Sequence, residues 1–211
     1  GFIIKSSGII VTNLHVIQGA HIINIKLFDG RDFFVNDIIE INIEKDIAIL
    51  KINAKGLPTI KLADSKKTKI GEAVYAIGNP IGEKRTITNG IISGKKTIND
   101  DFDILQFNAQ ITFGSSGGVL LNKNGAAIGI TSGGTSPKWG LELNYAIPIH
   151  YCQSVINNNF KPTMSIDEFR AIFSKSTNYS TETSKGMKIF YYSTLVISFL
   201  VWIAWGLMPP V

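Results

Sequence analysis

Cysteine is almost absent from this sequence, and its scarcity limits the chemistry open to the chain. Among 211 residues there is one cysteine, Cys152, so no disulfide can form within the chain and no cysteine-type zinc site can be built. The three histidines form no spaced metal cluster. We therefore expect no metal and no cofactor. We interpret Cys152 as a buried core thiol, and His21 and His150 as structural.

Charged residues are also few, at 18% of the chain against 45% hydrophobic residues, which excludes intrinsic disorder. The net charge of +5 comes from lysines in short groups such as Lys66-Lys67 and Lys95-Lys96. No basic stripe interleaved with aromatic residues is present, so we expect no nucleic-acid partner. A polybasic nucleic-acid or lipid binder stays the weakest alternative, and its binding would collapse with added salt.

Helical periodicity is nearly missing from the first 149 residues. Short runs rich in Ile and Val alternate there with turn signals such as Asp29-Gly30 and Asn79-Pro80. This pattern predicts an all-β protein with two halves of similar length, divided near Leu57-Pro58. The predicted strands are Gly8–Thr12, His21–Phe28, Ile47–Ile52, Glu72–Ile77, Arg85–Ser93, Asp103–Thr112, Gly117–Leu121 and Ala126–Thr131.

The chain changes character after residue 150. Residues 151–156 are consistent with a short terminal helix, and Ser165 with Glu168 fits a capping box that opens a helix through about Phe173. A Ser/Thr-rich polar stretch from Ser174 to Lys185 is typical of a linker. We therefore predict three parts: a folded domain over 1–157, a linker with a short helix over 158–187, and an apolar segment over 188–208.

The apolar segment has no charged residue between Ile189 and Met208. As a helix with about 1.5 Å rise per residue it would cross a hydrocarbon core of roughly 30 Å. Tyrosines and tryptophans lie toward its two ends, as an interfacial aromatic belt requires. We predict a single membrane-spanning helix, with a buried terminal helix of the folded domain as the alternative.

The sequence Gly114-Ser115-Ser116-Gly117-Gly118 is a candidate nucleophile turn. A serine hydroxyl needs a base to remove its proton, and the oxyanion formed on attack needs hydrogen-bond donors. Glycines permit a tight turn that points backbone N–H groups at one spot, although glycine–serine clusters are more often simple turns. His15 after an apolar strand and Asp46 at the head of another supply a base and its partner. Their order along the chain, His-Asp-Ser, is that of chymotrypsin-type proteases.

Further motifs resemble those of the HtrA/Deg family of trypsin-like peptidases, in the family's order and across residues 1–157. The matching residues are Gly1–Ile4, Gly8, Thr12-Asn13, His15-Val16, Gly19-Ala20, Asp46–Ile52, Asp64-Ser65, Gly71, Ala76–Pro80, Thr86–Ser93, Gly114–Gly118 and Tyr145–Pro148. The sequence departs from the family at Ser115, usually asparagine, and at Phe113 and Val119, where proline is common. After the protease-like region we expect the linker and the apolar segment in place of the PDZ domain that is usual in the family.

The resemblance implies two six-stranded-type β-barrels, a short terminal helix and a catalytic triad of His15, Asp46 and Ser116. Ser116 would attack the scissile carbonyl, His15 would act as general base and then acid, and Asp46 would orient the imidazole. The N–H groups of Gly114 and Ser116, with Ser115 as a further candidate, would form the oxyanion hole. Trimers are common in the family.

The resemblance also implies a substrate-binding region. The base of the primary pocket would be Gln110 with Ile111 beside it, so no carboxylate attracts Arg or Lys and a small or medium apolar residue is favoured. Core packing is the equally weighted alternative for Ile111. An edge strand over 130–133, with Thr131, Ser132 and Gly133, would pair with an extended, unfolded polypeptide substrate.

Two hypotheses follow for function. The first is a membrane-tethered serine endopeptidase acting in protein quality control; the second is a catalytically silent, membrane-bound binding module for unfolded polypeptide. Lys185 and Lys188 before the apolar segment would place the domain on the cytoplasmic side. The family habit is an exported protease, and we expect an exported domain held at the membrane.

Overall fold

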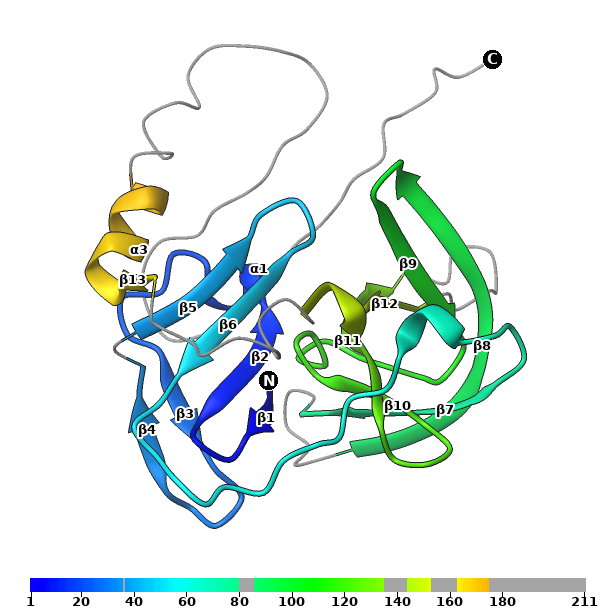
Figure 1. The fold of residues 1–211 in the computed structure, drawn as a ribbon, viewed down its shortest axis with the longest axis horizontal. Helices are drawn as coiled ribbons and strands as arrows, with labels where there is room; N and C mark the ends of the chain where they lie inside the picture. Colours follow the sequence, from blue (N-terminus) through cyan, green and yellow to red (C-terminus); the bar gives the residue numbers. More distant parts are fainter. Residues whose placement is uncertain (36, 80–85, 135–143, 153–162, 175–211) are drawn as a thin grey trace.

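Two β halves lie side by side in the computed structural model, which describes residues 1–35, 37–79, 86–134, 144–152 and 163–174 (Figure 1). The first half is built mainly from the N-terminal strands and the second from the strands after residue 72. The all-β prediction and the division near residue 57 agree with this arrangement. Two predicted strands are much shorter in the structure: His21–Phe28 contains only β3 (Asn24–Lys26), and Asp103–Thr112 is a strand only as far as Phe107.

The N-terminal half is an open five-stranded sheet in the order β1-β2-β6-β5-β13, with a separate hairpin of β3 and β4. The strands are β1 (Phe2–Lys5), β2 (Ile9–Asn13), β4 (Asp32–Phe34), β5 (Asp37–Asn42), β6 (Ile47–Lys51) and β13 (Met164–Ser165). The strands β2 and β6 are buried along nearly their whole length, which shows that both faces of this part of the sheet are covered. The expected closed barrel is thus not found here; the described residues form an open sheet.

The C-terminal half is a closed barrel of six antiparallel strands in the order β10-β11-β12-β9-β8-β7. These strands are β7 (Ala73–Gly78), β8 (Thr86–Asn99), β9 (Phe102–Phe107), β10 (Val119–Asn122), β11 (Ala127–Gly134) and β12 (Asn144–Pro148). Buried and exposed residues alternate along the first part of β7, as a barrel wall requires. This half confirms the barrel expected from the sequence.

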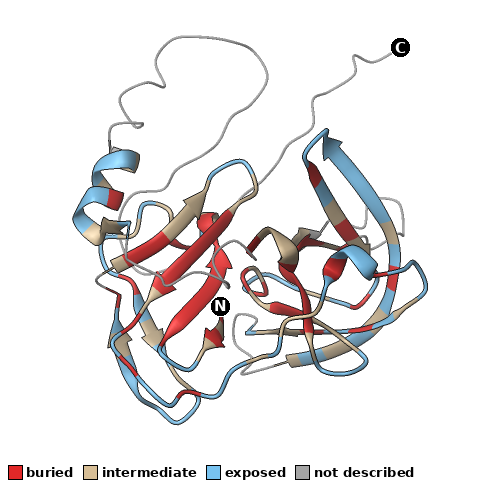
Figure 2. Ribbon diagram, viewed as in Figure 1, coloured by how far each residue is buried: buried red, intermediate tan, exposed pale blue. Residues whose placement is uncertain are grey.

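Buried residues, drawn red in Figure 2, form three apolar clusters. One lies within the N-terminal sheet around Leu50, and one fills the C-terminal barrel around Phe107. The third contains buried residues of both halves, such as Val11 and Ile49 from the first and Ile130 from the second. Burial across this third cluster joins the two halves but, being apolar, fixes no particular hydrogen-bond geometry between them.

The last described segment packs on the N-terminal sheet. Met164 pairs with Ile38 of β5, and the helix α3 (Ile166–Ser174) follows directly. The predicted capping box is confirmed: Glu168 accepts from the Ser165 N–H at 2.7 Å, and Ser165 Oγ accepts from the Glu168 N–H at 3.3 Å. Phe169 is fully buried in the N-terminal cluster. This segment is therefore part of the folded domain.

A short 3₁₀ turn, η2 (Ile149–Cys152), stands at the start of the predicted terminal helix, and Cys152 is buried. The rest of that helix, the expected domain boundary at residue 157, the polar linker up to Lys185 and the predicted membrane span over 188–208 lie outside the described residues. Within the described part, the structure has no helix that is long and apolar enough to span a membrane.

Candidate active site

Strand register brings His15 and Asp46 together. β2 and β6 are antiparallel neighbours, and Asn13 at the end of β2 faces Ile47 at the start of β6. The residues just beyond those ends therefore meet at one edge of the sheet. The short helix α1 (Leu14–Ile17) begins there, and the Leu14 N–H donates to the Asp46 carbonyl oxygen at 3.1 Å.

The Asp46 carboxylate binds His15 twice. The His15 backbone N–H donates to Asp46 Oδ1 at 2.8 Å, and His15 Nδ1 lies 2.6 Å from Asp46 Oδ2. The two side chains are 26% and 31% exposed, so the pair is partly shielded from water. Asp46 has φ 52°, and it is the only non-glycine residue of the described chain with positive φ. A strained backbone conformation persists only where surrounding contacts stabilise it, and such conformations are common at functional sites.

Two glycines shape the turn that carries Ser116. Gly114 and Gly117 have φ values of 91° and 78°, a conformation that L side chains rarely adopt. A Cβ at Gly117 would also overlap the Thr12 hydroxyl, because the turn lies directly against β2. The turn closes through the Ser115 N–H, which donates to the Thr112 carbonyl at 3.0 Å. The sequence therefore needs glycine at both positions to place Ser116 here.

The backbone N–H groups of Gly114 and Ser116 have no acceptor among the described residues. That leaves both donors available to a ligand oxygen. The Ser115 N–H is different, since it is already bonded to Thr112, and the Ser115 side chain is buried with its hydroxyl 3.3 Å from the Thr112 N–H. The expectation that Ser115 adds a third oxyanion donor is therefore corrected: Ser115 holds the turn together.

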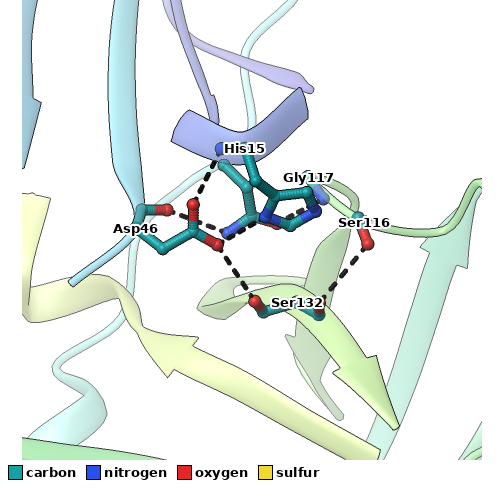
Figure 3. A network of polar contacts seen from close by, with 6 residues as sticks. His15, Asp46, Ser116, Gly117 and Ser132 are labelled. Carbon is teal, nitrogen blue, oxygen red and sulfur yellow. Dashed lines mark hydrogen bonds and ion pairs between the residues drawn. The ribbon is translucent and has the colours of Figure 1, made fainter. Parts of the chain in front are cut away.

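Ser132 connects the nucleophile turn with the acid. Ser116 Oγ donates to the Ser132 carbonyl at 3.4 Å, and Ser132 Oγ donates to Asp46 Oδ2 at 3.3 Å. Figure 3 shows the His15 ring between the Asp46 carboxylate and Ser116, with Ser132 below them. Residues from both halves thus converge on one site, and all three residues of the predicted triad lie in it.

Two of the predicted substrate-binding residues, Gln110 and Ile111, lie in the segment before the nucleophile turn. Gln110 is exposed, its carbonyl accepts from Thr88 Oγ1 at 2.6 Å, and Ile111 packs partly buried against the barrel core. Asn144 is buried and ties the same segment down, because its Nδ2 donates to the Ala109 carbonyl at 2.9 Å. The segment before the nucleophile turn is therefore anchored from two sides.

The prediction of an edge strand over 130–133 needs correction for its first two residues. Ile130 pairs with Val119 on one side and Ile147 on the other. Thr131 pairs with Ala146, and its N–H donates to the Gly118 carbonyl at 3.0 Å; its side chain is fully buried against Ser115. Gly133 pairs with Tyr145 on one side only, and Ser132 has no strand partner among the described residues, so these two positions stay the candidates for pairing with a peptide.

Asn13 was named in the sequence only as part of the Thr12-Asn13 motif, with no role assigned to its side chain. It is fully buried, its Nδ2 donates to the Asp46 carbonyl at 3.0 Å, and its Oδ1 accepts from the Gly117 N–H at 2.7 Å. Its position two residues before His15 could have marked it as a residue near the site. Its hydrogen-bond partner Gly117 lies 104 positions away in the sequence, so the contact itself could not be predicted. The link of Ser132 to Asp46 was missed for the same reason.

Two ionisable residues outside the site, Cys152 and His150, have pKa values that burial shifts away from their ordinary values. Burial raises the pKa of the Cys152 thiol to about 12, so this cysteine stays protonated at neutral pH. Burial also lowers the pKa of His150, whose Nδ1 lies 2.8 Å from Ser65 Oγ. His, Cys, Asp and Glu residues form no group suited to a metal ion within the described ranges.

Comparisons with known proteins show the family of this chain. Residues 1–130 match the model of the trypsin-like peptidase domain. The chain is 40% identical over 161 residues to a probable periplasmic serine endoprotease, DegP-like, of Pseudomonas putida, covering 74% of this chain and 33% of that protein. It is 39% identical over 160 residues to the mitochondrial serine protease HTRA2 of Drosophila persimilis, covering 72% and 36%.

A solved structure is similar as well. The HtrA-type protease AlgW with a decapeptide superposes with a TM-score of 0.67 at 36% identity, covering 73% of this chain and 49% of that one. The fold is thus mostly β and chymotrypsin-like. The chain belongs to the family of trypsin-like peptidase domains, as an HtrA/DegP-like serine protease domain. It spans about a third of the length of the Pseudomonas and Drosophila relatives.

Proposed function

We propose that this protein is a serine endopeptidase whose catalytic triad is His15, Asp46 and Ser116. The observation that carries the proposal is the convergence of Ser116 with a histidine that is already bonded through Nδ1 to a carboxylate at 2.6 Å. An imidazole held in this way keeps its Nε2 for the nucleophile, which is the arrangement that acyl transfer needs.

In the proposed mechanism, Ser116 Oγ attacks the scissile carbonyl carbon while His15 Nε2 takes its proton. The tetrahedral intermediate collapses, the C–N bond breaks, and His15 returns the proton to the leaving amine. Water then attacks the acyl-enzyme with His15 again as base, which releases the second product and restores Ser116. Asp46 holds the imidazole tautomer and stabilises the imidazolium in both steps.

The proposed oxyanion hole consists of the Gly114 and Ser116 N–H groups. Its support is that neither donor has an acceptor among the described residues, while both belong to one turn shaped by positive-φ glycines. Donors that are fixed before the reaction stabilise developing negative charge without reorganisation. Losing one such donor typically costs a factor of roughly 10² to 10³ in kcat.

We propose polypeptide substrates that bind extended, with Ser132 and Gly133 pairing with the peptide backbone and Gln110 and Ile111 at the primary pocket. The absence of a carboxylate at these two positions supports cleavage after small or medium apolar residues. The solved AlgW relative carries a decapeptide, which supports peptide binding in this family. Unfolded chains present such extended segments most readily.

The proposed setting is an exported domain tethered to a membrane and active in protein quality control. Support for export comes from relatives named as periplasmic, and support for tethering comes from the uncharged run over residues 189–208. Assembly into a trimer is the oligomeric state we expect, from the resemblance to the HtrA/Deg family.

A fluorophosphonate probe tests the proposal, because it reacts with an activated serine and not with an ordinary hydroxyl. Intact-mass measurement should show one adduct on the wild type and none on Ser116→Ala, with Ser65→Ala, at a buried serine bonded to His150, as the control that retains labelling. Cleavage of an unfolded protein should follow the same pattern. A wild type that is never labelled, yet binds unfolded polypeptide, would instead identify a silent binding module.

A further inference from the structure

The side chain of Asn13 bridges the two halves of the protein at the active site. It is the last residue of β2, directly before the helix that carries His15. Its amide donates to the Asp46 carbonyl at 3.0 Å and accepts from the Gly117 N–H at 2.7 Å. One buried side chain therefore touches the main chain of the acid and the main chain next to the nucleophile.

These two hydrogen bonds are not needed to satisfy buried backbone groups. The Asp46 carbonyl also accepts from the Leu14 N–H at 3.1 Å, and the Gly117 N–H also donates to the Thr131 carbonyl at 2.8 Å. Without Asn13, neither group would lose its last partner, so the penalty for an unsatisfied polar group would not arise. Burying an amide side chain costs free energy that an apolar side chain at the same position would not. What Asn13 adds is a fixed geometry between two segments.

Little else among the described contacts can supply that geometry. The cluster shared by the two halves is apolar and non-directional. The second polar link at the site runs through Ser132, and its two hydrogen bonds are longer, at 3.3 and 3.4 Å. The shortest polar connection between the His15–Asp46 pair and the Ser116 turn is thus the one through Asn13.

We propose that Asn13 is a positioning residue that sets the alignment of Ser116 with the His15–Asp46 pair. This inference rests on the function proposed above. Asn13 acts through Asp46 and Gly117 and touches no reacting atom. Because a displacement of about 1 Å in a catalytic constellation costs on the order of 10² in rate, a side chain that fixes this alignment influences kcat more than binding or folding.

Asn13→Leu tests the proposal, since leucine has a similar shape and makes no hydrogen bonds. Activity is measured per active site titrated with the fluorophosphonate, which separates the catalytic rate from the folded fraction. The expected result is a kcat lower by roughly 10- to 100-fold, with KM within about threefold of the wild type. Asn13→Asp keeps the acceptor for Gly117 but places an oxygen against the Asp46 carbonyl. It is expected to lower kcat by roughly tenfold, and it decides the question if the leucine variant does not fold.

Ser65→Ala is the matched control. Ser65 is also buried, and its hydroxyl bonds the His150 N–H at 3.0 Å and His150 Nδ1 at 2.8 Å, across 85 positions of sequence. The control removes a buried, long-range hydrogen-bonding side chain away from the triad, and it should leave kcat per titrated site unchanged. If both Asn13 variants also keep kcat within twofold, Asn13 is merely structural and the inference is overturned. If the wild type itself takes no label, the proposed function and the inference fail together.

Discussion

Replacement of Phe169 by alanine should destabilise the whole domain, although this residue lies in the region predicted as a linker. Its side chain is fully buried against the N-terminal sheet, and its ring centroid lies 4.9 Å from that of Phe173. A phenylalanine removes on the order of 200 Å² from water, which at about 25 cal/mol per Å² amounts to about 5 kcal/mol. Buried Phe→Ala substitutions measure about 3–5 kcal/mol, a large share of a total stability of about 5–15 kcal/mol.

Urea unfolding followed by circular dichroism gives the free energy of unfolding for each variant. The matched control is Ile172→Ala on the same helix, because this side chain is 43% exposed and should cost less than about 1 kcal/mol. The m-value should stay unchanged if the domain unfolds in one step. A Phe169→Ala variant as stable as Ile172→Ala would refute the reasoning, because α3 would then not belong to the apolar core of the N-terminal half.

Three further results follow from the structure. Gly117→Ala should abolish fluorophosphonate labelling, because a Cβ there overlaps Thr12 Oγ1 in a left-handed conformation; adding Thr12→Ala should restore part of it, and equal labelling of Gly117→Ala and the wild type would contradict the packing. Cys152, with its pKa raised to about 12 by burial, should react with a thiol reagent at about pH 8 only on unfolding, so rapid reaction in the native protein counts against its burial. The Ser165 N–H and hydroxyl hold the pKa of Glu168 below its ordinary value, so the ionised carboxylate stabilises the fold at neutral pH and this contribution is lost on acidification. In thermal melts, the Tm of Glu168→Gln should therefore lie below that of the wild type at neutral pH and approach it as the pH falls. A Tm difference that does not change with pH would exclude this linkage.

The β architecture was open to prediction because it depends on local signals. Runs of Ile and Val between turn residues indicate strands wherever they occur, and the capping box of Ser165 and Glu168 is a pattern of near neighbours. The sequence does not reveal whether a set of strands closes, since closure depends on pairing between distant residues. The open N-terminal sheet and the docking of β13 on β5 were missed for that reason.

The candidate site shows the same division. Its chemical groups were visible as motifs, because a histidine, an acid and a serine turn each have a recognisable setting. Their supports were not visible: Ser115 gives its N–H to the turn, and Thr131 is enclosed by pairing on both sides. Asn13 looked like one polar residue at a strand end, and only the folded chain brings it to Gly117. Long-range hydrogen bonds leave no periodic trace in a sequence.

The rate at which a fluorophosphonate modifies Ser116 tests the central claim most directly. Asp46→Asn preserves the shape of the site and removes the charge that holds the His15 imidazole, whereas Asp29→Asn removes an exposed carboxylate paired with Arg31. The account predicts a fall of roughly 10³- to 10⁴-fold for Asp46→Asn and no change for Asp29→Asn. A rate for Asp46→Asn within a few-fold of the wild type would contradict the proposed triad.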